Sequence, residues 1–149
     1  MCSMPHVYDI IILMEIHRKK VLIKLMLFAI FIAVLHYISL KFYLYWTTPI
    51  DILMHILGGA LIGIMSLYAI YFFLPIRHII NNQKKVFLIS VTATFIVGFL
   101  WEIFELKFGL ISHSFIDRID SIKDMFDDII GALLAGLYFV NKIKNNDRN

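Results

Sequence analysis

Five ionisable side chains have the residue types and the spacing of a site that binds a cation or moves protons. They form two pairs at four-residue spacing, with one glutamate between the pairs: Asp51 with His55, Glu102, and Asp124 with Asp128. Residues at positions i and i+4 face the same side of a helix. An oxygen-rich site with an imidazole suits a divalent cation, and Mg²⁺, Mn²⁺, Ca²⁺ and Zn²⁺ are all compatible with it. An acid beside a histidine can also act as a general acid or proton carrier.

We expect these residues to divide into two roles. His55 and Glu102 are the candidate catalytic pair and would handle protons. The candidate metal ligands, which hold a cation or orient His55, are Asp51, Asp124 and Asp128, joined by His55 and Glu102. Three further candidates are His36, Glu105 and Asp127. The sequence contains no GxSxG, HExxH, CxxC or Walker motif, which argues against a familiar hydrolase and leaves open whether the protein is an enzyme.

The composition is that of a membrane protein. Of the 149 residues, 60% are hydrophobic and 17% are charged, against about 45–50% and about 25% in soluble domains. The mean hydropathy is +0.82 and the pI is near 9.0. The formal net charge is +3, but the basic residues lie in short scattered groups rather than in one patch, so we expect no nucleic-acid partner.

Four apolar segments are long enough to cross a bilayer, which takes about 20 residues in a helix. We therefore predict an all-α fold, a polytopic membrane bundle of four transmembrane helices. The transmembrane domain is expected at residues 20–141, between an interfacial or cytoplasmic segment at 1–19 and a polar cytoplasmic tail at 142–149. The spans are predicted at about 22–46, 51–74, 86–106 and 123–140. A second reading starts the protein at Met14 instead of Met1.

The distribution of charge predicts the orientation of these spans. With the N-terminus inside, the cytoplasmic segments hold ten of the 14 Lys and Arg residues, and the opposite side receives eight of the 11 Asp and Glu residues. This matches the positive-inside rule. We therefore predict cytoplasmic N- and C-termini and an outward-facing acidic end. Asp117 and Asp120 are expected there in a solvated loop before the last span.

The last span carries acids into the membrane. From Asn141 back to Ile129 there are too few uncharged residues for a span of about 20, so this helix must include Asp127 and Asp128. Ionisable groups at membrane depth are costly and are therefore usually functional. At about 100° per residue, the helix faces predict a shared pocket near the outer boundary, formed by His55, Glu102, Glu105, Asp124 and Asp128. His36 is expected to be a packed, hydrogen-bonded polar residue.

Three short motifs resemble those of the VanZ-like membrane proteins. They are DILMHILGGALIG from Asp51, WEIFE around Glu102, and DMFDDIIGALLAG from Asp124. The resemblance implies a bacterial inner-membrane protein of four to five spans with a role in the cell envelope, because the namesake is associated with low-level glycopeptide resistance. Two positions depart from that pattern, since Asp128 replaces the family's Asn and Glu105 replaces its Gln. Both departures make the expected pocket more acidic.

These observations lead to one leading interpretation and two alternatives. The leading one is a multi-pass protein of the bacterial plasma membrane whose pocket binds a cation or polar head group and acts on, or recognises, an envelope lipid or lipid-linked precursor. The first alternative is a small proton- or cation-coupled transporter. The second is a structural or assembly subunit of a membrane complex. The expected partner is a membrane lipid, and a homo-oligomer is compatible with the sequence.

Overall fold

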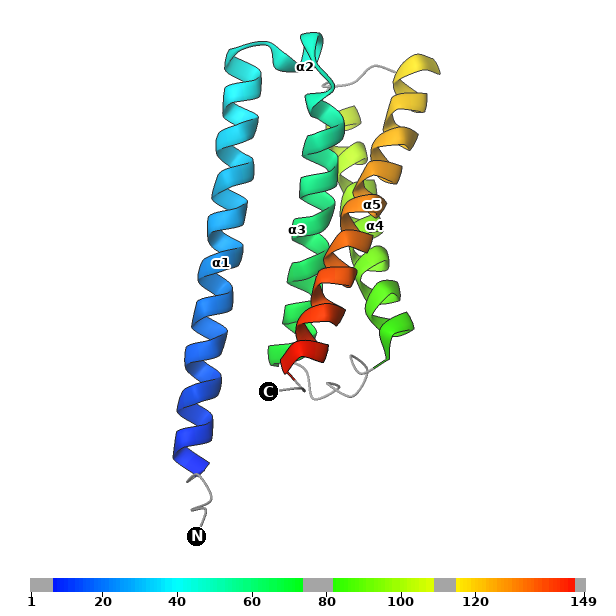
Figure 1. The fold of residues 1–149 in the computed structure, drawn as a ribbon. Coiled ribbons are helices and arrows are strands. Elements are labelled where there is room, and N and C mark those ends of the chain that lie inside the picture. The colour runs from blue at the N-terminus through cyan, green and yellow to red at the C-terminus, as the bar shows by residue number, and fades with distance from the viewer. Residues whose placement is uncertain (1–6, 74–81, 109–114, 147–149) are drawn as a thin grey trace.

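A computed structural model describes residues 7–73, 82–108 and 115–146 of the chain. It is a bundle of four long helices, with a short fifth helix at the end of the first connection (Figure 1). The helices are α1 (Val7–Lys41), α2 (Leu44–Thr47), α3 (Ile50–Phe73), α4 (Gln83–Lys107) and α5 (Phe115–Asn146). The start of α1 and the end of α5 lie at the same end of the bundle (Figure 1). The expected all-α membrane bundle is thus confirmed as a fold class.

Three of the long helices can cross a membrane by length and composition. Among the described residues these are Glu15–Lys41 within α1, Ile50–Phe73 and Gln83–Lys107. Helix α5 is longer than the predicted fourth span, but its first half carries seven charged residues, five of them aspartates, and it does not meet the same criterion. A span at 123–140 therefore stays a prediction, supported by the packing of α5 along α3 and α4. The segments 1–6 and 147–149 lie outside the described residues.

The ends of the helices differ in two places from the sequence prediction. Helix α1 ends at Lys41, short of the predicted boundary at 46, because Tyr43 takes a left-handed conformation with φ of 56° and starts the separate helix α2. Helix α5 begins at Phe115, so Asp117 and Asp120 belong to a helix and not to the expected loop.

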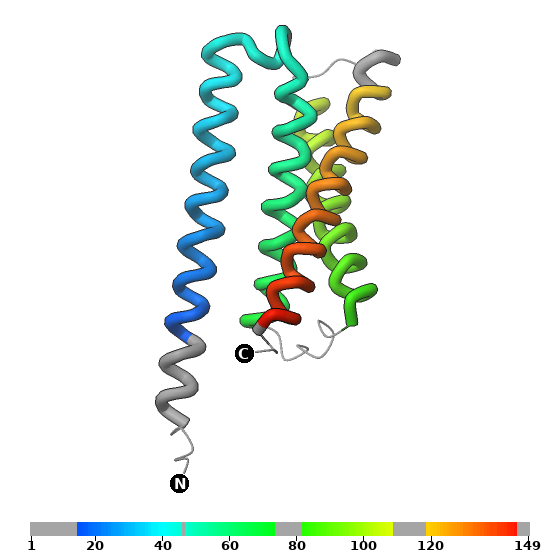
Figure 2. Tube along the Cα trace, viewed as in Figure 1, coloured from blue at the N-terminus to red at the C-terminus, as the bar shows by residue number. Residues whose placement is uncertain are grey.

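Helices α3, α4 and α5 form the packed unit of the bundle, and α1 runs beside α3 (Figures 1 and 2). The α3–α5 crossing is close because each helix places a glycine there. A methyl group at Gly59 would collide with the backbone of Asp128, and one at Gly131 would collide with the backbone of Ile56. Small residues allow helix backbones to approach in this way. Gly59 and Gly131 therefore serve the close packing of α3 on α5.

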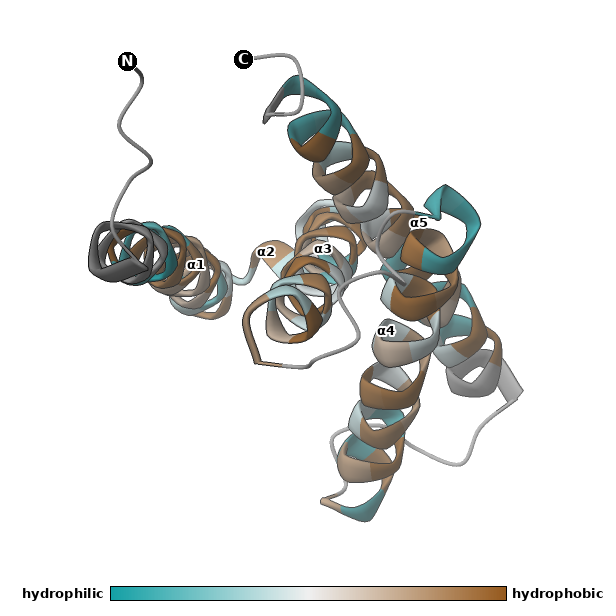
Figure 3. Cartoon of the chain, turned by 90° about the horizontal axis from the view of Figure 1, so that it is seen from below, coloured by the Kyte–Doolittle hydropathy of each residue, from teal (hydrophilic) through white to brown (hydrophobic). Residues whose placement is uncertain are grey.

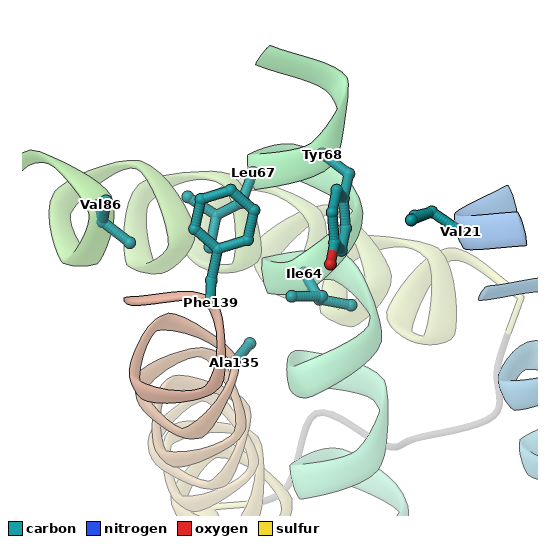
Figure 4. Close-up of a cluster of buried hydrophobic side chains, with 7 residues drawn as sticks. All are labelled: Val21, Ile64, Leu67, Tyr68, Val86, Ala135 and Phe139. Carbon is teal, nitrogen blue, oxygen red and sulfur yellow. The ribbon is translucent and has the colours of Figure 1, made fainter. Parts of the chain in front are cut away.

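The buried apolar core lies in the half of the bundle where α5 ends. Its side chains come from all four long helices: Val21, Ile64, Leu67, Tyr68, Val86, Ala135 and Phe139 (Figure 4). The rings of Tyr68 and Phe139 meet edge to face at 5.2 Å, a favourable geometry for aromatic pairs. Helix α1 contributes little to this core, since only 6% of its apolar window is buried. Seen along the bundle, α1 stands to one side of the other three long helices (Figure 3), and most of its apolar side chains are exposed.

Candidate functional site

The acidic residues of α3 and α5 converge on one histidine. His55 Nε2 lies 3.7 Å from Asp51 Oδ1 and 3.7 Å from Asp124 Oδ2. Its other ring nitrogen, Nδ1, lies 3.4 Å from Asp128 Oδ1. The imidazole is largely buried, with 14% of its side chain exposed. Both ring nitrogens therefore face carboxylates, and two different helices supply them.

The glycines at the helix crossing explain how these side chains meet. Gly59 lies one turn after His55 on α3, and its Cα packs directly on the backbone of Asp128. The crossing brings this turn of α5 against α3 without any side chain between the backbones. The hydroxyl of Thr94 on α4 donates to the Gly59 carbonyl at 3.2 Å and ties the third helix to the same point. The site is therefore built on rigid packed helices rather than on loops.

Asp128 is positioned by α4 as well as by His55. Its Oδ1 faces the histidine, and its Oδ2 lies so close to Gly98 that a methyl group at that glycine would collide with it. A carboxylate that accepts the Nδ1 proton of a histidine fixes the tautomer and leaves Nε2 free to ligate. Nε2 is the nitrogen that faces Asp51 and Asp124. This geometry fits Asp128 better as the residue that orients His55 than as a direct ligand.

Asp124 lies between the imidazole of His55 and the ammonium group of Lys123. Its Oδ2 faces His55, while its Oδ1 lies 3.4 Å from the ammonium group of Lys123. The same ammonium lies 3.1 Å from Asp120 Oδ1. Asp124 is buried, with 7% of the residue exposed, whereas the side chain of Lys123 is 43% exposed. Lys123 therefore neutralises part of the negative charge from the solvent-facing side of the site.

The two glutamates of α4 lie on the helix face that meets α5. Gly98 touches Asp128, and Glu102 and Glu105 follow it at i+4 and i+7 on that face. Because α4 and α5 run in opposite directions, Glu102 lies at about the level of Asp124. Glu105 interacts electrostatically with Glu102, His55 and Asp51. Within the described part of the chain, however, Glu102 makes no hydrogen bond or ion pair to His55, so the candidate catalytic pair is not in direct contact.

Two further candidates lie outside this cluster. His36 on α1 accepts or donates a 2.6 Å hydrogen bond with the hydroxyl of Tyr45, in keeping with a bonded polar residue. Tyr45 in turn interacts electrostatically with Asp51 and Glu105, which connects His36 to the site only indirectly. Asp127 is 9% exposed, and its Oδ2 is buried without a hydrogen-bond partner among the described residues. It sits on a neighbouring face of α5, about 60° from Asp124.

Three of these residues offer a set of ligand atoms that could hold a divalent cation. Asp51, His55 and Asp124 each offer one ligand atom, and all three atoms lie within 4.8 Å of one another. Two ligands of one cation can be separated by at most twice the metal–ligand distance. That limit is about 4.6–5.2 Å for Ca²⁺ and about 4.0–4.4 Å for Zn²⁺. The mixed oxygen and nitrogen donors suit a borderline cation such as Zn²⁺ or Mn²⁺, for which the ligand atoms would have to lie somewhat closer together than 4.8 Å.

Lys123, Gly98 and Thr94 contribute to the site but were not identified from the sequence. Lys123 is the immediate neighbour of Asp124, and adjacent residues on a helix do not face each other, so spacing predicts its pairing with Asp120 at i,i+3 but not its contact with Asp124. Gly98 lies four residues after Thr94 and eight after Ser90, so the sequence did carry a small-residue pattern on this face of α4. A second available signal was that Gly98 lies four residues before Glu102, on the same helix face.

Comparison with known proteins yields a family. A family model described as "Predicted membrane protein (DUF2238)" matches residues 2–145. The match supports the membrane assignment that the resemblance to VanZ-like proteins implied, and it does not extend to the VanZ-like proteins specifically. Searches of curated proteins and of solved structures each found no match.

Proposed function

The chain belongs to the DUF2238 family of predicted membrane proteins, and we propose that it uses the Asp51–His55–Asp124 site to bind a divalent cation. The observation that carries this proposal is the convergence of three ligand atoms from α3 and α5 within 4.8 Å. His55 would ligate through Nε2, and Asp51 and Asp124 would each supply one oxygen. Asp128 would hold the imidazole in place through Nδ1, and Glu102 would lie nearby as a base or outer ligand.

The bound cation would give the protein a way to recognise lipid. A divalent cation held by two carboxylates and one imidazole keeps open coordination positions, and these can accept a phosphate oxygen of a lipid head group. The predicted orientation places this site near the outer face of a bacterial inner membrane. We therefore propose recognition of an envelope lipid or lipid-linked precursor, with chemistry on that lipid as an extension that His55 and Glu102 would serve.

Coupled transport is the weaker alternative. A transporter needs a polar path that continues from the site into the other half of the membrane. Ser90 and Thr94 are the buried hydroxyl groups of α4 below the site, but they donate to the carbonyls of Ala132 and Gly59 at 2.8 Å and 3.2 Å. Because both hydroxyls donate to backbone carbonyls of neighbouring helices, they do not extend a polar path. This favours a cation-binding function over coupled transport.

Metal analysis of the purified protein tests the cation site. Protein purified with native lipids should contain a substoichiometric to stoichiometric divalent metal, and the metal-depleted protein should bind Zn²⁺ or Mn²⁺ in calorimetry. Asp124→Asn and His55→Gln should each weaken this binding by at least tenfold, because each removes a ligand. Glu15→Gln is the control, since it removes the same charge from an exposed residue of α1 at the other end of the bundle and should change the affinity less than threefold.

Two results would refute the proposal. One is the absence of any divalent cation from the purified protein together with the absence of binding by the depleted form. The other is an equal loss of affinity in Asp124→Asn and Glu15→Gln, which would mean that the acids act only through bulk charge.

A further inference from the structure

A cavity lies in the half of the bundle opposite the acidic site. It has a volume of about 320 Å³ and lies between α1, α3 and α5. Such a volume falls within the range of about 300–1,000 Å³ typical of small-ligand sites. Among the described residues, the backbone of α1 comes close to α2 and α3 but not to α5. Between α1 and α5, therefore, the cavity is bounded by side chains alone. We call it the α1–α5 groove.

The α1–α5 groove is apolar along its length and basic at one end. The rest of its lining consists of aliphatic residues and Phe28, and Ala60 and Ala135 contribute small side chains to it. Two lysines from different helices, Lys24 of α1 and Lys142 of α5, belong to its lining. Lys142 lies in the last turns of α5, and Lys24 lies at the middle of α1, one turn after Val21 of the buried core. Both therefore lie in the half of the bundle that the charge distribution predicts to be cytoplasmic.

Two tyrosines complete the basic end of the groove. The Lys142 ammonium lies over the rings of Tyr68 and Tyr138, at 5.5 Å and 5.8 Å from their centroids. Burial acts to lower the pKa of Lys142, but its hydrogen bonds and attraction to these two tyrosines outweigh burial and leave that pKa above its ordinary value. Lys142 is therefore a fixed positive charge held at the mouth of an apolar groove.

The length of the groove matches one leaflet of a bilayer. From Leu134 to Lys142 the lining extends over eight residues, or about 12 Å at 1.5 Å per residue. Half of a hydrocarbon core of about 30 Å is about 15 Å. Leu134 and Tyr138 are 52% and 53% exposed, so the groove is open along α5 toward the surrounding lipid. A lipid chain could therefore enter sideways with its head group at the lysines.

We propose that the α1–α5 groove binds one acyl chain of an anionic phospholipid of the predicted cytoplasmic leaflet, with its phosphate between Lys24 and Lys142. Basic pockets between transmembrane helices on the cytoplasmic side are the usual sites for anionic head groups. The tyrosine hydroxyls add hydrogen-bond donors for the phosphate. The lipid would fill the gap between α1 and α5 and hold α1 against the bundle, where its own packing is slight.

Native mass spectrometry of the detergent-purified protein tests this proposal. Dioleoyl phosphatidylglycerol should bind at a defined stoichiometry and at least tenfold more tightly than dioleoyl phosphatidylcholine. The double variant Lys24→Ala/Lys142→Ala should lose roughly tenfold or more of this affinity, because each lysine loses an ion pair with the phosphate. The matched control is Lys84→Ala/Lys85→Ala, which removes two exposed lysines near the same end but outside the groove and should bind as the wild type does.

A second variant separates the groove from surface charge. Leu134→Trp adds bulk at the open side of the groove and keeps both lysines. It should weaken phosphatidylglycerol binding while the thermal unfolding of the protein stays unchanged. Unchanged lipid binding in this variant would overturn the proposal, as would an equal loss of affinity in the Lys84/Lys85 control.

Two further outcomes identify a different occupant. Competition by free glycerophosphoglycerol at the same concentration as the lipid would mean a phosphate site without an acyl chain, and the proposal would be wrong. A change of oligomeric state in Leu134→Trp, measured by light scattering, would mean that a second copy of the chain covers the groove, which would equally refute the lipid.

Discussion

Lys123 should oppose the binding of a cation at the acidic site, so its removal should tighten that binding. Its ammonium lies 3.4 Å from Asp124 Oδ1, on the side of the carboxyl group away from His55. A cation between Asp124 Oδ2 and His55 Nε2 would lie roughly 6 Å from that ammonium, allowing ~2 Å for each metal–ligand bond. Lys123 and the cation would thus compete for the carboxylate of Asp124, each at a different oxygen.

The size of the effect follows from the charges and their exposure. A unit charge and a double charge 6 Å apart repel by ~1.4 kcal/mol at the dielectric constant of water, and that value applies because 43% of the Lys123 side chain is exposed. Lys123→Gln should therefore raise the affinity for a divalent cation by about tenfold. The gain should shrink in high salt, since exposed charges are screened over about 10 Å at 0.1 M ionic strength.

Calorimetric titration of the metal-depleted protein with Zn²⁺ or Mn²⁺, at low and at high NaCl, measures this effect. Lys107→Gln is the matched control, because it removes one exposed lysine from the last turn of α4, at the same end of the bundle. It should change the affinity less than twofold. A lower or unchanged affinity in Lys123→Gln would refute the reasoning and would mean that Lys123 positions Asp124 instead of competing for it.

Three other substitutions test the positioning of the site and the packing around it. Gly98→Ala should push Asp128 away and weaken cation binding severalfold, whereas Gly58→Ala, where a methyl group meets nothing within 4 Å, should leave binding unchanged; equal effects would contradict this. Asp127→Asn should stabilise the protein by about 1 kcal/mol in thermal unfolding, because it removes the charge of a buried carboxylate whose Oδ2 has no hydrogen-bond partner among the described residues; a lower melting temperature would point to an unseen ligand. Ser90→Ala should destabilise it by about 0.6 kcal/mol, the mean for hydrogen bonds between transmembrane helices, and no loss would show that the bond to the α5 backbone contributes nothing.

The residues of the acidic cluster could be predicted because helix periodicity is strong in membrane spans. Asp51 and His55 share a face at i and i+4, as do Asp124 and Asp128, and glycines one turn further along each helix indicate where the two faces meet. The roles within the cluster could not be predicted in the same way. Which oxygen of Asp124 faces Lys123 depends on side-chain rotamers, and sequence spacing carries no information about them.

The position of α1 and the break after it also could not be predicted from the sequence. Hydropathy does not distinguish a span that packs against protein from one that faces lipid, because both are apolar. Helix α1 therefore reads like the other spans although it barely packs on them. The break at Tyr43 requires a positive φ, for which glycine or asparagine is the usual signal. A tyrosine at this position does not predict a helix break.

Charge balance narrows what the acidic site can hold. Four carboxylates, those of Asp51, Asp120, Asp124 and Asp128, face Lys123 and His55. Even with a protonated histidine, two negative charges are left over. An anionic phosphate cannot approach such a site directly, since like charges at close range are unfavourable, and it needs a bridging divalent cation. The α1–α5 groove has the opposite charge and would take an anionic head group without one. Asp124→Asn should therefore abolish cation binding and leave phosphatidylglycerol binding at the lysines intact, and loss of both would mean that the two ends of the protein are not separate sites.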